Sequence, residues 1–281
     1  TGKLDPLDVL DMPDWIPRLG RLRNRPHLKF FEEAVDSMLA RRRAALARDP
    51  DGAPPDLLTL LLRATDPETG TSLSDVEIKA NLVTFIIAGH ETTSNALTFA
   101  LYLLSQDSEA RDRAEAEVDR AMPDGRLPQG YAEALPFTRA VIDEAMRLYP
   151  PAATISRQAA GPDRLGGLPI RAGTTVVVAP WVLHRHKLLW DDPTSFVPER
   201  FLPGNRGSID RFAYLPFGAG PRVCIGASFA LQEAVAVLAT VTRGFRLTLA
   251  PGHEVMPVQR VALRSRGGMP MAVRRRSVSA S

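Results

Sequence analysis

The stretch Phe217-Gly218-Ala219-Gly220-Pro221-Arg222-Val223-Cys224-Ile225-Gly226 holds the only cysteine of the 281-residue chain. An alanine-rich segment follows it, and its composition predicts a helix over 227–240. A cysteine just ahead of a helix faces unpaired backbone N–H groups and the positive end of the helix dipole, and both favour the thiolate. Since a thiolate is a good ligand for iron, we predict that Cys224 binds a metal.

The residues around this cysteine suit a flat cofactor that carries carboxylates. Gly218, Gly220 and Gly226 allow tight turns and a close backbone approach, and Arg222 offers a permanently charged fork to a carboxylate. A haem has both a flat face and propionate carboxylates. A lone cysteine is more often a small buried apolar residue, so Cys224 by itself does not decide the question.

The stretch resembles the haem-binding loop of the cytochrome P450 family, whose pattern is matched at Phe217, Gly220, Arg222, Cys224 and Gly226. Three further segments are similar to the other family motifs, in the family's order: Ala88-Gly89-His90-Glu91-Thr92-Thr93 to the oxygen-activating helix motif, Glu144-Ala145-Met146-Arg147 to E-x-x-R, and Pro198-Glu199-Arg200-Phe201 to P-E-R-F. The resemblance implies haem b (iron protoporphyrin IX), with Cys224 as its axial ligand. The implied cofactor-binding residues are Ala88, Gly89, Arg157, Phe217, Gly218, Gly220, Arg222, Cys224 and Gly226.

The oxygen-activating motif falls in the middle of a predicted helix. Ser74-x-x-Glu77 is a capping box, and the proline-free, largely apolar segment after it predicts one buried helix over 75–105. The Thr92 hydroxyl is expected to bond back to a carbonyl and open a local bulge for water. The resemblance implies that Glu91 and Thr92 are catalytic and deliver protons to oxygen. A mid-helix Glu-Thr-Thr is otherwise ordinarily a solvated face.

Residues outside the cysteine loop and the oxygen-activating motif are assigned expected roles from their place in the sequence. Glu144 and Arg147 lie three residues apart on a predicted helix over 135–149, and the resemblance adds Arg200 as the third member of a structural network for folding and haem retention. It makes Arg157 a second propionate-binding arginine. The segment before Arg157 is expected to line the substrate pocket through Ala152, Ala153, Thr154 and Ile155. A metal site at His184 and His186 is the less favoured alternative to a surface or structural role.

The fold class predicted is mainly α with small β-hairpins (α+β), a cytochrome P450 fold that lacks its N-terminal part. We expect a single haem-binding domain over 1–281, with 277–281 disordered. The sequence pattern predicts helices over 25–48, 56–63, 75–105, 108–122 and 135–149, and strands over 176–179, 245–249, 261–264 and 269–273.

Composition limits the class of protein. A content of 44% hydrophobic and 24% charged residues is typical of a soluble globular protein, and one cysteine cannot form an internal disulfide, which favours the cytoplasm. No secretory signal is visible in 1–10, although the resemblance leaves open an N-terminal membrane anchor ahead of these residues. A net charge of +3 with only short arginine runs does not indicate nucleic acid as a partner.

The function implied is a haem-thiolate monooxygenase that inserts one oxygen atom from O2 into an apolar organic substrate. Its electrons are expected from a separate ferredoxin or flavoprotein reductase, because the chain carries no flavin or dinucleotide motif. Three alternatives remain open. They are a peroxide-driven peroxygenase or an isomerase on the same haem, a truncated haem-binding fragment without activity, and, more remotely, a cysteine hydrolase.

Overall fold

The structure, a computed structural model, describes residues 19–277. Contacts within the chain group it into two units, one that ends at Ala88 and one that begins at Gly89, and each is described by itself. The expectation of a single haem-binding domain stays a prediction. The expectation of no secretory signal in 1–10 concerns residues that the structure does not describe, and so does the expected disorder of 277–281 beyond Ser277.

The first unit contains α2 (Leu19–Arg48), α3 (Leu57–Arg63) and the first part of α4 (Asp75–Gln106). Its core joins Val35 and Leu39 to Leu58, Ile78 and Leu82, so one apolar stripe from each helix is buried. The bounds of α3 and α4 agree with the predicted ranges to within one residue, whereas α2 begins at Leu19, ahead of the predicted start at 25.

Side chains fix where α3 and α4 begin. The Asp56 carboxylate accepts a hydrogen bond from the Thr59 N–H at 3.0 Å, which caps α3. The Glu77 carboxylate accepts from the Ser74 N–H at 2.8 Å, and the Glu77 N–H donates to the Ser74 hydroxyl at 3.3 Å. This reciprocal pair confirms the capping box predicted from the sequence.

α4 is one uninterrupted α-helix, and the predicted bulge is wrong. The Ser94 hydroxyl donates to the His90 carbonyl at 2.8 Å and the Thr98 hydroxyl to the Ser94 carbonyl at 2.7 Å. Such bonds use a second lone pair of each carbonyl, so the backbone ladder stays intact. The expected burial also fails in the middle of the helix, where Ile87 is 58% exposed because no described element covers it.

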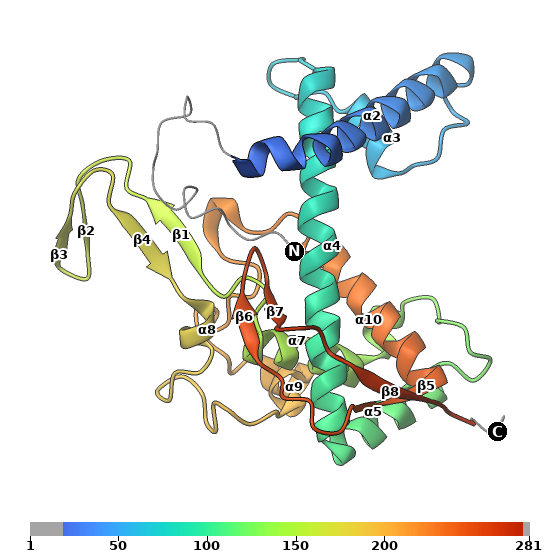
Figure 1. Ribbon diagram of the computed structural model, residues 1–281, viewed down its shortest axis with the longest axis vertical. Helices are drawn as coiled ribbons and strands as arrows, with labels where there is room; N and C mark the ends of the chain where they lie inside the picture. The colour runs from blue at the N-terminus through green and yellow to red at the C-terminus, as the bar shows by residue number, and fades with distance from the viewer. Residues whose placement is uncertain (1–18, 278–281) are drawn as a thin grey trace. The chain divides into compact units, whose positions relative to one another are not determined.

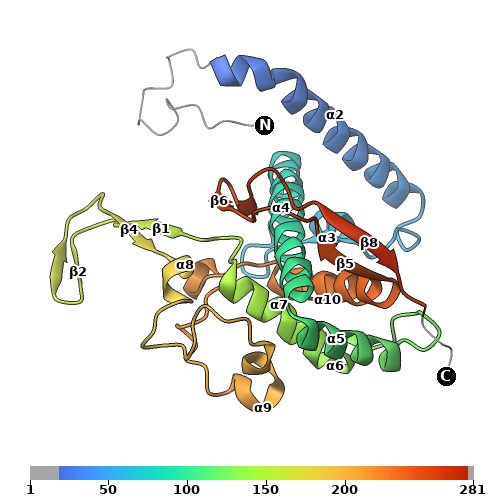
Figure 2. The same ribbon diagram turned by 60° about the horizontal axis from the view of Figure 1, so that its bottom comes forward.

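The second unit is built on a helical bundle. The end of α4, α5 (Ser108–Ala121), α7 (Pro136–Leu148) and α10 (Ala227–Gly244) share one apolar core, and Figure 2 shows α5, α7 and α10 beside one another. Small residues at the contacts, such as Ala100, Ala145 and Ala234, let the helices approach closely. The short helices α6 (Tyr131–Ala134), α8 (Pro180–Leu183) and α9 (Pro203–Arg206) lie in the connections.

A buried carboxylate holds α5 to the start of α7. Glu117 accepts hydrogen bonds from the Phe137 N–H at 2.8 Å, the Thr138 N–H at 2.7 Å and the Thr138 hydroxyl at 2.7 Å. Pro136 occupies the first turn and has no N–H to satisfy. Glu117 therefore caps a helix from outside it, and its negative charge faces the positive end of the α7 dipole.

Four two-stranded antiparallel sheets complete the second unit (Figure 1). The pairs are β1 (Ile155–Gln158) with β4 (Thr175–Val178), β2 (Asp163–Leu165) with β3 (Leu168–Ile170), β5 (Phe245–Leu249) with β8 (Met271–Arg275), and β6 (Pro257–Gln259) with β7 (Leu263–Ser265). Every predicted strand overlaps an observed one. The described part of the chain is thus mainly α with small β-hairpins, as predicted.

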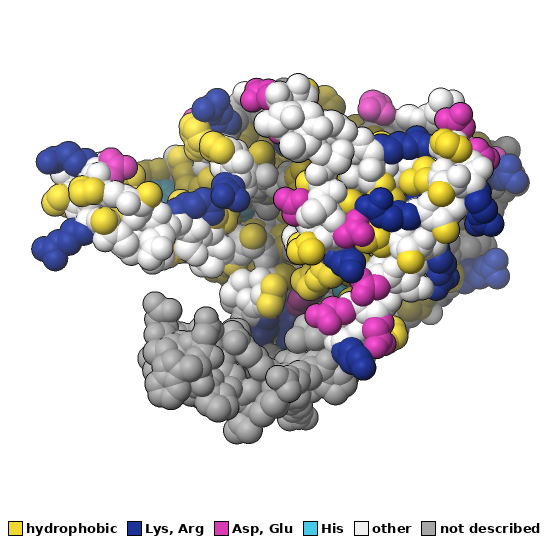
Figure 3. All heavy atoms as spheres, turned by 90° about the horizontal axis from the view of Figure 1, so that it is seen from above, with side chains coloured by type: hydrophobic (Ala, Val, Ile, Leu, Met, Phe, Trp, Pro, Cys, Tyr) yellow, Lys and Arg dark blue, Asp and Glu magenta, His cyan; other side chains and the backbone are white. Residues whose placement is uncertain are grey.

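The hairpin β2–β3 projects from the second unit. Leu165 and Leu168 at its turn are 57% and 69% exposed. Figure 3 shows hydrophobic side chains between Lys and Arg side chains at the left end, where Figure 1 draws this hairpin. Among the described residues, no helix has the length and apolar character needed to cross a bilayer.

Candidate active site

The cysteine loop is closed by its own backbone. The Cys224 N–H donates to the Phe217 carbonyl at 2.9 Å, and the Val223 N–H donates to the Gly220 carbonyl at 3.0 Å. Gly218 and Gly220 have φ angles of +74° and +75°, which L side chains rarely adopt. α10 then begins at Ala227, so Cys224 lies just ahead of a helix, as the sequence predicted.

Two glycines of the loop lie close to other groups. A Cβ built at Gly218 would lie 3.7 Å from Cδ1 of Ile155, and one built at Gly226 would lie 3.9 Å from Sγ of Cys224. The Cys224 sulfur therefore sits beside the residue that precedes α10. Ile155, expected in the substrate pocket, lies against the same loop.

The surroundings of Cys224 fit a flat apolar cofactor. The thiol is free and exposed, and exposed apolar side chains surround it in sequence, with Ile225 at 86% and Phe229 at 73% exposure. A soft sulfur donor among apolar side chains, on a loop of glycines, is the donor set that a haem iron takes from a cysteine. The residues present thus fit a thiolate-ligated haem.

The two arginines expected to bind propionates are exposed, and Glu91 and Thr92 of the helix motif are only half-buried. Arg222 is exposed, and Arg157 is exposed on β1, where its Nη1 donates to the Ser156 carbonyl at 2.8 Å. Glu91 and Thr92 are half-buried on α4. A Cβ built at Gly89 would meet nothing within 4 Å, so the described chain leaves this face of the helix open.

Glu144 and Arg147 form a fully buried ion pair on α7. Arg147 donates from Nε and Nη2 to the two carboxylate oxygens of Glu144, at 2.6 Å and 2.7 Å. Its other donors reach the carbonyls of His184 at 2.8 Å, Pro193 at 2.7 Å and Ser195 at 2.9 Å. All five N–H groups of the guanidinium are thereby used, which compensates for the loss of hydration.

Arg200 approaches this pair from the P-E-R-F turn, residues Pro198–Phe201. Its Nε lies 3.7 Å from Oε1 of Glu144, and its Nη2 donates to the Asp192 carbonyl at 3.2 Å. The Val197 N–H donates to the same Oε1 at 2.9 Å. Burial raises the pKa of the Glu144 carboxyl, although Arg147, the Val197 N–H and Arg200 act in the opposite direction. The structure thus brings together all three predicted members of the network.

The four residues expected in the substrate pocket do not behave alike. Ala153 is buried in a core cluster with Phe99 and Leu263, whereas Thr154 is exposed and Ala152 and Ile155 are half-buried. Ala153 therefore occupies a core position. The pocket role of these residues stays a prediction.

The sequence reasoning missed the role of His184. Its imidazole is fully buried, and Nε2 accepts a hydrogen bond from the Leu215 N–H at 2.8 Å. Burial lowers its pKa to about 4, which holds the ring neutral. His186, its partner in the less favoured metal-site alternative, is exposed and accepts from the Leu188 N–H at 3.3 Å. No local signal distinguished these two histidines, because the partner Leu215 is 31 residues further along the chain.

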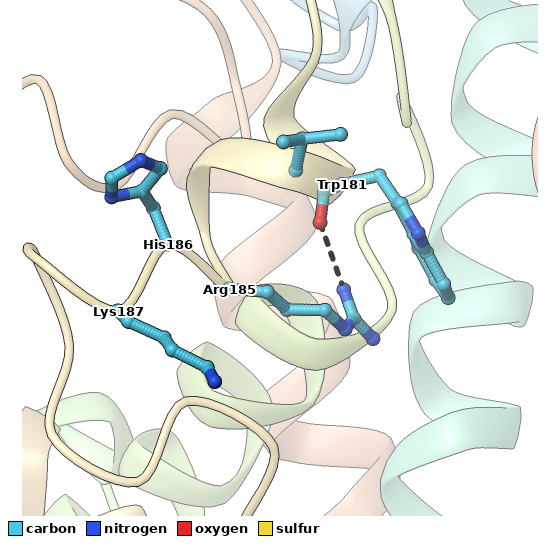
Figure 4. A pocket seen from close by; sticks show the side chains of 5 residues that line it. Trp181, Arg185, His186 and Lys187 are labelled. Carbon is cyan, nitrogen blue, oxygen red and sulfur yellow. Dashed lines mark hydrogen bonds between the residues drawn. The ribbon is translucent and has the colours of Figure 1, made fainter.

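A separate hollow of about 470 Å³ is formed by α8 and the residues that follow it, and it is lined by Trp181, Val182, Arg185, His186 and Lys187. Figure 4 shows the Arg185 guanidinium against Trp181, whose ring centre is 3.7 Å away, while the His186 ring lies apart from this pair. Arg185 also donates to the Trp181 carbonyl at 3.2 Å. None of the predicted haem-site residues lines this hollow.

The helical bundle, the buried Glu-Arg pair and the cysteine loop ahead of α10 define the class of thiolate-ligated haem proteins. The family model described as Cytochrome P450 matches residues 4–269. The chain therefore belongs to the cytochrome P450 family, whose cofactor is haem b.

Individual relatives agree with this assignment. The chain is 41% identical over 237 residues to "Bifunctional cytochrome P450/NADPH--P450 reductase 2" of Bacillus subtilis, covering 84% of this chain and 22% of that protein. It is 38% identical over 248 residues to "Cyclooctat-9-en-7-ol 5-monooxygenase" of Streptomyces melanosporofaciens, covering 88% of this chain and 52% of that protein. The solved cytochrome P450DA heme domain superposes with a TM-score of 0.86 at 33% identity, covering 98% of this chain and 59% of that one. The chain thus spans about half or less of the curated relatives it matches here.

Proposed function

We propose that the protein acts as a haem-thiolate monooxygenase, with Cys224 as the axial ligand. The observation that carries the proposal is the glycine-bounded loop that presents a free, exposed cysteine ahead of α10. When bound, the haem supplies the reductive activation of O2, and a thiolate ligand favours cleavage of the O–O bond. Arg157 and Arg222, both exposed, are proposed to bind its propionates.

Glu91 and Thr92 are proposed to deliver the protons that O–O cleavage requires. Their half-buried positions on α4 follow Ala88, Gly89 and His90, and the first two of these are small and exposed. A carboxyl group that reaches solvent can carry protons inward, and a neighbouring hydroxyl can pass them to a bound oxygen. The predicted bulge is not needed for this role, because both side chains project from a regular helix.

The substrate is proposed to be an apolar organic molecule. Half-buried Ile155, whose Cδ1 lies near Gly218 of the cysteine loop, offers apolar surface for it. Two relatives are named as oxygenases of particular organic compounds, cyclooctat-9-en-7-ol and pentalenene. These names support the reaction class and leave the substrate itself open.

The electron donor is proposed to be a separate ferredoxin or flavoprotein reductase. The relative from Bacillus subtilis is named as a fusion with its reductase, so a fused donor is the competing arrangement. Arginines on α5 offer positive charge for docking an acidic donor. Arg113, however, is paired with Glu199 at 2.6 Å and Arg111 with Asp112 at 3.3 Å. Arg120 is exposed and is the best placed of the three.

The test is the carbon monoxide difference spectrum of the reduced chain, expressed with haem available. A strongly red-shifted Soret band in the wild type that is lost in Cys224→Ser supports the proposal. A band that persists in Cys224→Ser would assign the ligand elsewhere and overturn it. Haem that binds without this band, or no bound haem, favours the inert-fragment alternative, and turnover with peroxide but not with reductant and O2 favours the peroxygenase.

A further inference from the structure

His184 connects the buried Glu144–Arg147 pair to the cysteine loop. Arg147 donates to the His184 carbonyl at 2.8 Å, and the His184 ring accepts from the Leu215 N–H at 2.8 Å. The Leu215 carbonyl in turn accepts from the Gly218 N–H at 3.2 Å, inside the loop. A continuous series of hydrogen bonds therefore runs from α7 to the residue at which the loop begins to turn.

The protonation state of the ring follows from this geometry. Because Nε2 accepts a hydrogen bond from an N–H group, the single ring proton must be on Nδ1. Within the described residues Nδ1 has no hydrogen-bond partner. The ring is thus held as one neutral tautomer.

The groups that face this ring are mainly cationic or aromatic. Arg147 on α7 and Arg185 after α8 are the nearby cations, and the Tyr214 ring lies with its centre 5.3 Å from that of His184. Both cations oppose a second positive charge on the imidazole. Protonation would also turn Nε2 into a donor aimed at the Leu215 N–H, and that hydrogen bond would be lost.

We propose that His184 is a positioning residue for Cys224. The neutral imidazole of His184 fixes the start of the cysteine loop by accepting the Leu215 N–H. The proposal rests on the proposed function only in taking Cys224 as the haem ligand. If His184 merely filled space, an apolar side chain of similar size would replace it without effect on the loop. The hydrogen-bond acceptor at Nε2 is therefore the feature to test.

Three variants separate these possibilities. His184→Leu fills part of the volume and removes the acceptor, whereas His184→Gln places an amide oxygen near the position of Nε2. His186→Leu is the matched control, because His186 is an exposed histidine two residues away that also accepts a backbone N–H. The readout is amide hydrogen exchange at Leu215 and Gly218, measured on the full chain whether or not haem is bound.

Exchange at Leu215 is expected to be about tenfold faster in His184→Leu, since one buried hydrogen bond is lost. Rescue by His184→Gln to within about threefold of the wild type, with no change in His186→Leu, is the expected pattern. Unchanged exchange at Leu215 in His184→Leu would overturn the proposal, as would equal acceleration in the Gln and Leu variants.

A measurement on the wild type covers the case in which the variants do not fold. The 15N–15N coupling across the hydrogen bond from Leu215 N to His184 Nε2 is expected to be observable, and its absence would also overturn the proposal. The two proposals fail separately. Cys224→Ser abolishes the red-shifted band and is expected to leave Leu215 protected, whereas His184→Leu exposes Leu215 in the haem-free chain as well.

Discussion

Arg147 donates two parallel hydrogen bonds to the carboxylate of Glu144, three residues earlier on α7, and both side chains are completely excluded from solvent. The spare donors of the arginine hold the carbonyls of His184, Pro193 and Ser195. One side chain on a helix thus organises two segments of an irregular passage that has little regular structure of its own.

Arg147→Lys is expected to lower the free energy of unfolding by about 3–5 kcal/mol. A lysine keeps the charge but cannot form the fork or reach three carbonyls, so buried acceptors are left unpaired. Denaturant unfolding measures the effect. Arg139→Lys on the same helix is the control, because Arg139 is 32% exposed beside Asp143 and is expected to cost less than about 1 kcal/mol. Equal effects in the two variants would contradict the prediction.

Glu117→Ala is expected to destabilise the protein by about 2–4 kcal/mol. The change removes the acceptor of three hydrogen bonds at the start of α7, two of them from backbone N–H groups that stay buried. Glu109→Ala, in the exposed first turn of α5, serves as the comparison. Thermal unfolding of both variants measures the difference, and a Glu117→Ala variant as stable as Glu109→Ala would refute the capping role.

Gly218→Ala is expected to cost about 1–2 kcal/mol and to weaken haem binding. The cost comes from the φ angle of +74°. Space is available, since the nearest atom to an added Cβ is 3.7 Å away. Gly204→Ala in α9 is the matched control, because a Cβ there meets nothing and the backbone is helical. Haem affinity that responds equally to both changes would contradict a role for the backbone conformation of the loop.

Stability is expected to fall in acid because of His184. Burial lowers its pKa in the folded chain from 6.5 to about 4, so the unfolded chain binds the proton more tightly. The contribution of the neutral His184 ring to the free energy of unfolding is fully present above pH 6.5. It is lost progressively as the pH falls from 6.5 to about 4, and the total loss is about 3 kcal/mol. Unfolding free energies of the wild type and His184→Gln between pH 7 and pH 4 test this. Parallel pH profiles would contradict it.

Thr92→Ala and Glu91→Gln are each expected to reduce product formation with reductant and O2 by about 100-fold. Turnover with added peroxide is expected to persist, since that route does not need the same proton delivery. Ser94→Ala is the control, because its exposed hydroxyl bonds only to carbonyls of its own helix. Equal loss in the O2 and peroxide reactions would argue against proton delivery by this pair.

The helices could be predicted because their signals are local. The capping box of Ser74 and Glu77 predicts the start of α4, and Pro136 predicts the start of α7. The positions of β4, β5, β7 and β8 were also predictable, whereas β1, β2, β3 and β6 were missed. The pairing was not predictable, since β5 pairs with β8 across an intervening hairpin. Antiparallel pairing over such a distance depends on tertiary packing, which periodicity does not encode.

The site was predictable where a fixed spacing carries the chemistry. Cys224 and its glycines share one loop, and Glu144 and Arg147 share one helix face. His184 was not predictable, because its partner comes from a segment with no pattern relating it to the histidine. The exposed middle of α4 was missed because an apolar helix indicates burial and does not say which element provides it.

The hydrogen bonds that lead to the start of the cysteine loop also affect the order of folding. Arg147 and His184 are 37 residues apart, and His184 and Leu215 a further 31, so the loop entry depends on two successive long-range closures. Closing each of these loops costs chain entropy before the contacts that stabilise the closed loop have formed. The cysteine loop is therefore expected to be among the last parts to reach its native geometry. During folding the cysteine would become competent for its cofactor only after the surrounding scaffold is in place.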